Sequence, residues 1–327
     1  MLLITGGTGF IGKYIVQEFL SAGYDIRLLV RNPAKRTLPS WSNLVEIAEG
    51  DILDQLSLEK ALDGVTEVVH AAGKVSFWRK EKEEIMAINQ GGTALLVDLC
   101  LAANIQKLVH VSSIAAIGHR MDGGLITEDT PWGGKSLSHY SLSKRRAEME
   151  VYRGIAEGLQ AVMVNPALVI GADSNWDEGT AKMYKIVNRG LSFYNPGGNG
   201  FVAAADVAKA CRLLLEENVP NGERYLLAAE NLSYQTYFSW VAEALGKRPP
   251  SRKLGPFLTL TVGRISEFLS NLTGKPPIVS LETMRSGLAA RAYDGSKITG
   301  LEFSYQSIHE VVNETARQFQ ADKTKQA

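Results

Sequence analysis

The chain has 327 residues, of which 45% are hydrophobic and 21% are charged, a composition typical of a globular protein with a sizeable core. Lys and Arg together number 35, as do Asp and Glu, so the formal net charge is zero. This balance leaves no basic excess of the kind that nucleic acid or an anionic membrane attracts, and we expect no nucleic-acid partner.

The cysteines, the histidines and the first residues of the chain bear on disulfides, metal binding and secretion. Cys100 and Cys211 are isolated thiols in helix-like stretches, and the five histidines show no metal-binding spacing. The apolar start "MLLITGG" lacks the positively charged segment of a secretory signal. We expect a cytoplasmic protein with neither a disulfide framework nor a metal site.

Two hydrophobic periods alternate along the first half of the chain. Helix-like patterns separate short apolar runs that are typical of strands, at residues 2–5, 26–30, 44–48, 67–72, 107–113 and 161–167. Strands that alternate with helices indicate βαβ units. The sequence therefore predicts an α/β fold, a doubly wound parallel sheet with helices on both faces.

The pattern changes after Gly171, where turn-rich loops precede a more helical region. A strand is expected at 223–228 and a helix at 233–246, with Ser233 as its N-cap. We predict a dinucleotide-binding domain over 1–171, to which segments at about 200–230 return. Residues 172–327 would form mainly a smaller, mostly helical, substrate-binding lobe.

The apolar stretch at 255–272 is interrupted by Arg264 and Glu267. It therefore falls short of the ~20 apolar residues that a membrane span requires. We expect an amphipathic helix that covers a pocket or the core, and no stable membrane insertion. A peripheral membrane contact is the alternative.

Three glycines stand between the first predicted strand and the first predicted helix, in "LLITGGTGFIGKYIV". Glycine allows a sharp turn and lets a pyrophosphate approach the N–H groups at a helix N-terminus. Any tight strand-to-helix turn favours glycine, but this context indicates dinucleotide binding. The loop residues expected to contact the cofactor are Gly6, Thr8, Gly9, Phe10, Ile11 and Gly12.

The second predicted strand ends in basic residues. Arg31 lies where an NAD-binding unit usually has an acid that binds the ribose 2′-OH, and Lys35 and Arg36 follow. A carboxylate would repel a 2′-phosphate, whereas Arg can bind one through charge-assisted hydrogen bonds. We predict NADP as the cofactor, with NAD as the second choice. A solvated basic loop is the alternative.

Two later stretches also follow strands. In "GDILD" (50–54), Asp51 could bond the adenine amino group and Ile52 could pack on the ring, although Asp51 could equally be a turn residue. In "HAAGK" (70–74), the small residues Ala71, Ala72 and Gly73 would let the cofactor pass close to the backbone.

The fifth predicted strand ends in two serines, Ser112 and Ser113, and "YSLSK" follows at Tyr140 to Lys144. Tyr is a useful general acid when a nearby Lys ammonium lowers its pKa, and positions i and i+4 share one helix face. A serine hydroxyl opposite can bind the same substrate oxygen.

The pattern Tyr-x-x-x-Lys is weak evidence alone, because it also occurs as "YDGSK" at 293–297. We expect this second copy to be a helix start, with Asp294 or Ser296 as cap and Tyr293 packed behind it.

The motifs "TGGTGFIG", "GDILD", "HAAG", "NQGGT", "VSS", "YSLSK" and "NPALVIG" occur in this order, and together they resemble an extended short-chain dehydrogenase/reductase. The resemblance implies a Rossmann-like fold, a nicotinamide cofactor and a Ser/Tyr/Lys catalytic set. Ser113 would hold the substrate oxygen, Tyr140 would be the acid/base, and Lys144 would tune it. Tyr140, Lys144, Asn165 and Pro166 would also contact the cofactor.

The family's nucleotide-sugar members carry an Arg-Pro-x-Asn-x-Tyr-Gly stretch, for which this chain has "NPALVIG". An Arg of their later signature corresponds to Asn199. The chain therefore looks more like the dihydroflavonol 4-reductase and 3β-hydroxysteroid dehydrogenase branch.

We predict an NADP(H)-dependent oxidoreductase that reduces a ketone or aldehyde, or oxidises the alcohol, of a small, partly apolar substrate. An NAD-dependent nucleotide-sugar epimerase or dehydratase is the alternative, and a non-catalytic scaffold is a third. The family also implies a homodimer paired through helices 80–102 and 140–157. Aromatic candidates for pocket walls are Phe77, Trp78, Trp176, Tyr184 and Phe193.

Overall fold

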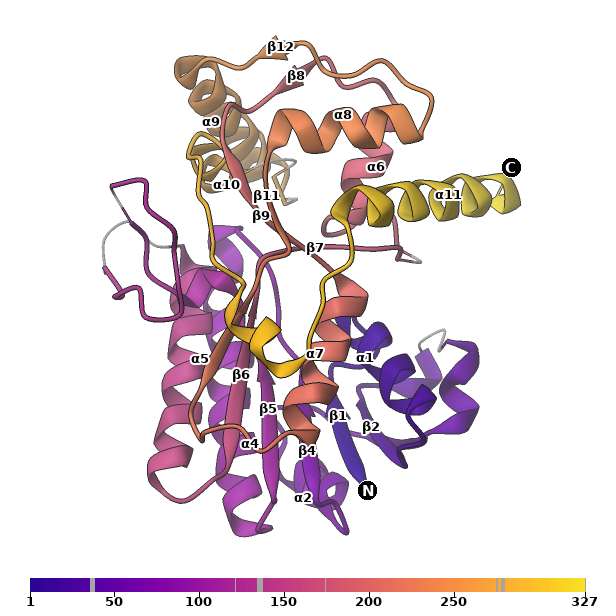
Figure 1. The fold of residues 1–327 in the computed structure, drawn as a ribbon, viewed down its shortest axis with the longest axis vertical. Helices are drawn as coiled ribbons and strands as arrows, with labels where there is room; N and C mark the ends of the chain where they lie inside the picture. The colour runs from indigo at the N-terminus through magenta and orange to yellow at the C-terminus, as the bar shows by residue number, and fades with distance from the viewer. Residues whose placement is uncertain are drawn as a thin grey trace. The chain divides into compact units, whose positions relative to one another are not determined.

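The computed structural model describes residues 1–35, 39–120, 122–133, 138–173, 175–274, 276–277 and 280–326. The chain divides into two compact units (Figure 1). Unit 1 comprises Met1–Gly118, Thr130–Pro166 and Ala204–Leu227, and unit 2 comprises His119–Asp129, Ala167–Ala203 and Ala228–Ala327. Segment 204–227 belongs to the first unit. The assignment of substrate binding to the second unit stays a prediction.

Unit 1 is built on a seven-stranded sheet in which every neighbouring pair is parallel. The strands are β1 (Leu2–Thr5), β2 (Ile26–Val30), β3 (Glu46–Glu49), β4 (Glu67–His70), β5 (Lys107–Val111), β6 (Ala161–Pro166) and β10 (Arg224–Leu227). Their order is β10-β6-β5-β4-β1-β2-β3. The order reverses between β1 and β4, and ligands of open parallel sheets bind beyond the carboxyl ends at such a point. The predicted doubly wound parallel sheet is confirmed.

Helices cover both faces of this sheet. They are α1 (Phe10–Ser21), α2 (Gln55–Leu62), α3 (Lys82–Met86), α4 (Gly92–Ala102), α5 (His139–Ala156) and α7 (Ala204–Glu216). Helix α1 packs on α7, whereas α4 packs on α2 and α5 (Figure 1). The core between sheet and helices is apolar, with Leu58, Val68 and Leu96 fully buried. The third strand begins later than its apolar run suggests, because Ser40–Leu44 forms a 3₁₀ helix.

One helical run of described residues, Arg79–Ala102, has the length and apolar composition of a membrane span. Its side chains are used inside unit 1, where Ile85, Leu96 and Val97 are fully buried. The run includes a π-helical turn, Ala87–Gly91, that turns Asn89 into the interior. A core helix of an α/β domain explains the composition.

Unit 2 contains more strand than the sequence predicts. A three-stranded sheet of order β11-β9-β7 joins β7 (Leu168–Ile170), β9 (Gly198–Ala203) and β11 (Glu230–Ser233), and β8 (Phe193–Tyr194) pairs with β12 (Arg252–Lys253). The helices are α6 (Ala181–Asn188), α8 (Tyr234–Ala244), α9 (Pro256–Thr273), α10 (Leu281–Ser286) and α11 (Ile308–Gln326). Ser233 caps α8 as predicted, because its hydroxyl accepts from the Thr236 N–H at 3.0 Å.

The second Tyr-x-x-x-Lys copy lies in unit 2. The Asp294 carboxylate accepts from the Ser296 N–H at 3.0 Å, ahead of a 3₁₀ helix that begins at Lys297. Tyr293 is only 4% exposed. The packed tyrosine is confirmed. Ser296 holds the N-cap position but makes no side-chain cap hydrogen bond to a described residue, and Asp294 bonds the Ser296 N–H ahead of the helix. Tyr293 and Lys297 do not share a helix face.

Helix α9 differs from the prediction. We expected it to cover a pocket or the core, but its large apolar side chains are exposed, among them Phe257 and Phe268. Trp176 and Tyr184, two of the predicted pocket walls, are buried in the core of unit 2 instead.

Candidate active site

The glycine loop follows β1 directly and leads into α1. Gly6 has φ +74°, and a Cβ there would lie 2.5 Å from the backbone of Ala71. A Cβ on Gly12 would lie 2.1 Å from the Gly6 carbonyl oxygen. Gly9 closes the turn, because its N–H donates to that oxygen at 2.9 Å. Only glycine fits at Gly6 and Gly12, and the loop presents the first N–H groups of α1 as an anion cradle.

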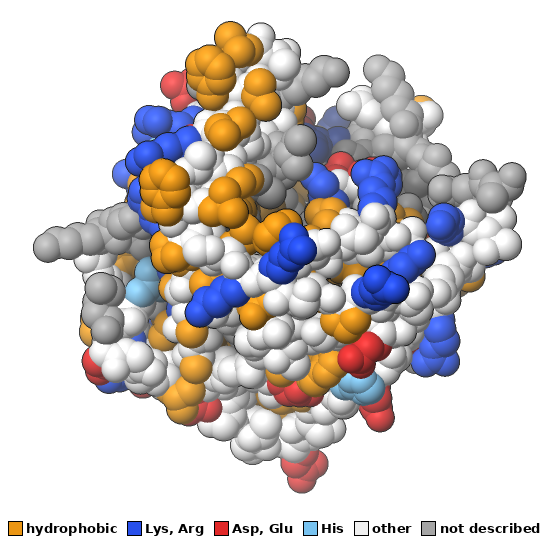
Figure 2. All heavy atoms as spheres, turned by 90° about the horizontal axis from the view of Figure 1, so that it is seen from above, with side chains coloured by type: hydrophobic (Ala, Val, Ile, Leu, Met, Phe, Trp, Pro, Cys, Tyr) orange, Lys and Arg blue, Asp and Glu red, His pale blue; other side chains and the backbone are white. Residues whose placement is uncertain are grey.

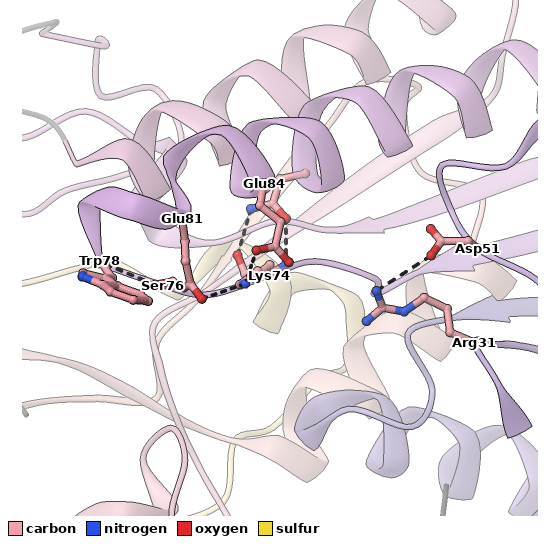
Figure 3. Close-up of polar contacts among 8 residues, drawn as sticks. Arg31, Asp51, Lys74, Ser76, Trp78, Glu81 and Glu84 are labelled. Atoms are coloured by element: carbon pink, nitrogen blue, oxygen red, sulfur yellow. Dashed lines mark hydrogen bonds and ion pairs between the residues drawn. The ribbon is translucent and has the colours of Figure 1, made fainter. Parts of the chain in front are cut away.

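The ends of β2 and β3 bring together two residues that the sequence assigned to the cofactor. Arg31 Nη1 lies 3.8 Å from Asp51 Oδ2, and both side chains are partly exposed (Figure 3). The other Asp51 oxygen accepts from the Leu53 N–H at 3.0 Å, so Asp51 is also a turn residue. Ile52 is buried against the core. Arg36 lies outside the described residues.

The small residues after β4 lie beside the glycine loop. The Ala71 N–H donates to the Thr5 carbonyl at 3.0 Å, and the Ala72 N–H donates to the Thr5 hydroxyl at 3.3 Å. A Cβ on Gly73 would lie 3.6 Å from the Lys144 ammonium nitrogen. Residues 71–73 therefore lie between the glycine loop and Lys144.

Asn89 anchors the loop that follows β4 through hydrogen bonds to the Lys74 backbone. Its side-chain oxygen accepts from the Lys74 N–H at 2.7 Å, and its nitrogen donates to the Lys74 carbonyl at 3.0 Å and to Ser143 Oγ at 2.9 Å. The Lys74 ammonium in turn lies 3.0 Å from Glu81 and 2.7 Å from Glu84 (Figure 3). The π-helical turn is thus tied both to the loop and to α5.

Tyr140 lies in the first turn of α5, which Ser138 caps by accepting from the Ser141 N–H at 2.7 Å. The Ser113 hydroxyl lies close enough to the Tyr140 phenol to affect its pKa, and it accepts from the Ala115 N–H at 3.1 Å. Phe77, a predicted pocket wall, packs edge-on against the Tyr140 ring at 5.7 Å between centroids. Lys144 is one turn further along α5, nearly buried, and donates to the Val111 carbonyl at 2.9 Å.

The electrostatics of the pair differ from the expectation. Burial raises the pKa of Tyr140, and the neighbouring Ser113 hydroxyl offsets only part of that rise. The expected lowering by Lys144 is not found, because the ammonium is directed to the Val111 carbonyl. Burial lowers the pKa of Lys144 itself to about 8, against the opposing effect of Glu148.

Glu148 is a site residue that the sequence analysis missed. Its fully buried carboxylate accepts from Ser112 Oγ at 2.6 Å and from Asn165 Nδ2 at 2.5 Å. The same Asn165 nitrogen donates to the Ser113 carbonyl at 3.0 Å. The two serines thus differ in their neighbours: Ser112 bonds Glu148, whereas Ser113 lies beside Tyr140. Position i+4 after Lys144 on one helix was the available signal.

Asn165 and Pro166, which the resemblance assigned to the cofactor, are both buried at the end of β6. The Asn165 amide nitrogen is engaged inside unit 1, and a contact to the cofactor stays a prediction. Among the described residues, no group of three or more His, Cys, Asp and Glu side chains is placed to hold a metal ion.

Residues 2–228 match the model of a family described as "NAD dependent epimerase/dehydratase family". The chain belongs to this family. It is 30% identical over 329 residues to a putative dihydroflavonol 4-reductase of Synechocystis, and the match covers 97% of this chain and 94% of the relative. It is 28% identical to sterol demethylase protein B of Methylococcus capsulatus, with 78% of each chain covered.

The crystal structure of gox2253 superimposes on this chain with a TM-score of 0.84, at 30% identity and with 98% of both chains covered. The resemblance to extended short-chain dehydrogenases/reductases is thereby confirmed, and the chain is an NAD(P)-dependent enzyme of that superfamily. The cradle of Gly6 and Gly12, which a Cβ would fill, fits a dinucleotide pyrophosphate.

Proposed function

We propose that the protein is an NADP(H)-dependent reductase that converts a ketone or aldehyde of a small, partly apolar molecule to the alcohol. The observation that carries this proposal is the placement of Ser113, Tyr140 and Lys144 together beyond the carboxyl ends of β4 and β5. Residues 71–73 lie between this proton donor and the glycine cradle.

The protonation states support a general-acid role. A raised pKa keeps the Tyr140 phenol protonated at neutral pH, which is the form that gives a proton to a carbonyl oxygen. The bound nicotinamide supplies the hydride. Ser113 donates a hydrogen bond to the substrate oxygen. The Lys144 ammonium, charged below its pKa of about 8, has further donors besides the one bonded to Val111, with which it can bind the nicotinamide ribose.

The proposed substrate class is inferred from two residues that follow β6 in the sequence. Ile170, at the position where the resemblance expects a Tyr in nucleotide-sugar members, is fully buried in the core of unit 2. Asn199, at the position of their Arg, accepts from the Gly200 N–H at 3.0 Å. The names of the two relatives, a dihydroflavonol reductase and a sterol demethylase component, also favour apolar ring systems.

The test is a screen of carbonyl compounds, from small aldehydes to flavonoid and steroid ketones, with loss of reduced-nicotinamide absorbance as the readout. NADPH and NADH are compared throughout, and a UDP-sugar panel is run in parallel. We expect NADPH-dependent turnover of an apolar ketone or aldehyde. Conversion of a UDP-sugar without net nicotinamide turnover would contradict the proposal and support the epimerase alternative.

A further inference from the structure

Helix α9 has its small and polar residues inside and its large apolar residues outside. Thr259, Gly263 and Ser270 are buried. The exposed fractions on the outer side are large: Phe257 84%, Leu258 47%, Val262 38%, Ile265 54%, Phe268 63%, Leu269 51% and Leu272 69%. We call these seven residues the α9 face. Exposed apolar patches of this kind mark interaction sites in folded proteins.

The orientation of α9 is set by its packing on α10. A Cβ on Gly263 would lie 2.8 Å from the Leu281 Cα, so glycine permits this close approach. The Glu267 carboxylate accepts from the Leu281 N–H at 2.9 Å at the start of α10. Because α10 packs against the side of α9 that carries Gly263 and Glu267, the α9 face is exposed to solvent.

The segment of the chain that carries the α9 face has an excess of positive charge. Residues 246–287 contain seven Lys and Arg but only two Asp and Glu, a net charge of +5 in a chain whose total is zero. Among the described residues, no acidic side chain forms an ion pair with Lys247, Arg248, Arg252, Lys253 or Arg264. Figure 2 shows hydrophobic side chains gathered on this side of the molecule with Lys and Arg beside them.

We propose that the α9 face binds peripherally to a membrane surface that contains anionic phospholipids. A helix that lies in the interface buries one apolar face among the acyl chains while neighbouring Lys and Arg meet the headgroups. Eighteen residues give α9 a length of ~27 Å, enough to lie along the surface. A second copy fits less well, because a symmetric contact would place two patches of +5 against each other.

Vesicle co-sedimentation of the full chain tests the proposal. The vesicles are phosphatidylcholine alone or mixed with phosphatidylglycerol. The wild-type protein should sediment with the mixed vesicles at low salt and be released by high salt, because salt screens the headgroup attraction. The double variants Phe257→Ser/Phe268→Ser and Arg252→Gln/Lys253→Gln should each bind about tenfold less tightly or worse.

The matched control is Leu44→Ser/Leu56→Ser, which removes two equally exposed leucines from unit 1 (65% and 68% exposed) and should bind like the wild type. All four positions in the apolar variants are exposed, so thermal unfolding should be unchanged. Absence of wild-type binding at low salt, or full binding by Phe257→Ser/Phe268→Ser, overturns the proposal. So does a dimer in solution that this variant dissociates without any vesicle binding, since the α9 face would then join two copies.

Discussion

Glu148 is connected to two members of the proposed catalytic set, Ser113 and Lys144. It bonds Ser112 beside Ser113, it bonds the Asn165 amide that holds the Ser113 carbonyl, and it raises the pKa of Lys144. A fully buried carboxylate must be compensated by such partners. Arg145 and Arg224, each 3.4 Å away, provide the rest of the compensation. We infer that Glu148 is a positioning residue for the reaction.

Glu148→Gln tests this inference. The neutral amide no longer opposes burial, so the pKa of Lys144 falls further below 8 and the ammonium is lost at a lower pH. Carbonyl reduction should slow about tenfold at neutral pH, with its alkaline decline shifted to lower pH. The pH profile of kcat/KM is the measurement. Glu150→Gln, two residues along α5, is the control, and an unshifted alkaline limb in Glu148→Gln would contradict the inference.

Arg31 decides the cofactor preference in this account. It is half exposed and paired with Asp51 only at 3.8 Å, so its guanidinium is available to a 2′-phosphate. Arg31→Ala should weaken NADPH binding at least tenfold and leave NADH binding nearly unchanged, because only NADPH carries that group. Fluorescence titration gives both dissociation constants. Arg31→Lys should retain part of the preference, and equal losses for both cofactors would refute the role.

His70 and His110 are both buried, but within the described part of the chain only His70 is hydrogen-bonded, so the pair tests how a buried polar group affects stability. His70 bonds Thr5 at 2.7 Å and Thr93 at 3.0 Å, whereas neither ring nitrogen of His110 has a hydrogen-bond partner among the described residues. His110→Phe should therefore stabilise the protein by about 1 kcal/mol at pH 7, and His70→Phe should destabilise it by a similar amount. Denaturant unfolding measures both, and a destabilised His110→Phe would contradict the argument.

The same two histidines also make the folded state less stable at acid pH. Burial lowers the pKa of His70 to about 3 and that of His110 well below 6.5, so only the unfolded state takes up their protons just below pH 6.5. Stability is therefore full above pH 6.5. Below pH 6.5 each histidine lowers it by about 1.4 kcal/mol per pH unit until the pH reaches that group's own lowered pKa. His110→Phe should reduce this slope.

At the scale of elements, the β1–α1 loop depends on glycine at Gly12. Gly12→Ala would place a methyl group against the Gly6 carbonyl, so the loop must open, and NADPH affinity should fall more than tenfold. Gly91→Ala is the control, because no atom lies within 4 Å of that Cβ and alanine favours helix by about 0.5–1 kcal/mol. Unchanged cofactor affinity in Gly12→Ala would exclude the loop as the phosphate site.

The order of strands and helices in unit 1 follows from the sequence because strand and helix periods are local. The orientation of α9 does not, since hydrophobic periodicity shows that a helix is two-sided but not which side faces a neighbour. The close approach of Gly263 to Leu281 settles that tertiary contact. The 3₁₀ helix at Ser40–Leu44 likewise replaces the start of an expected strand.

At the scale of the whole molecule, the sequence locates Ser113, Tyr140 and Lys144 because the order of motifs implies one sheet edge. It does not single out Glu148, because in "SKRRAEME" a glutamate is more often a solvated helix charge. The zero net charge also conceals the +5 of residues 246–287, since a total carries no information on distribution. The burial of Glu148 is known only from the folded chain.

The central claim is that Tyr140 donates the proton during NADPH-dependent carbonyl reduction. Its most direct test compares Tyr140→Phe with Tyr293→Phe, the tyrosine of the second Tyr-x-x-x-Lys copy, on a carbonyl substrate found by the screen. We predict that Tyr140→Phe loses kcat by ~10²-fold or more while its NADPH affinity is retained, and that Tyr293→Phe stays active. Undiminished kcat in Tyr140→Phe would contradict the account.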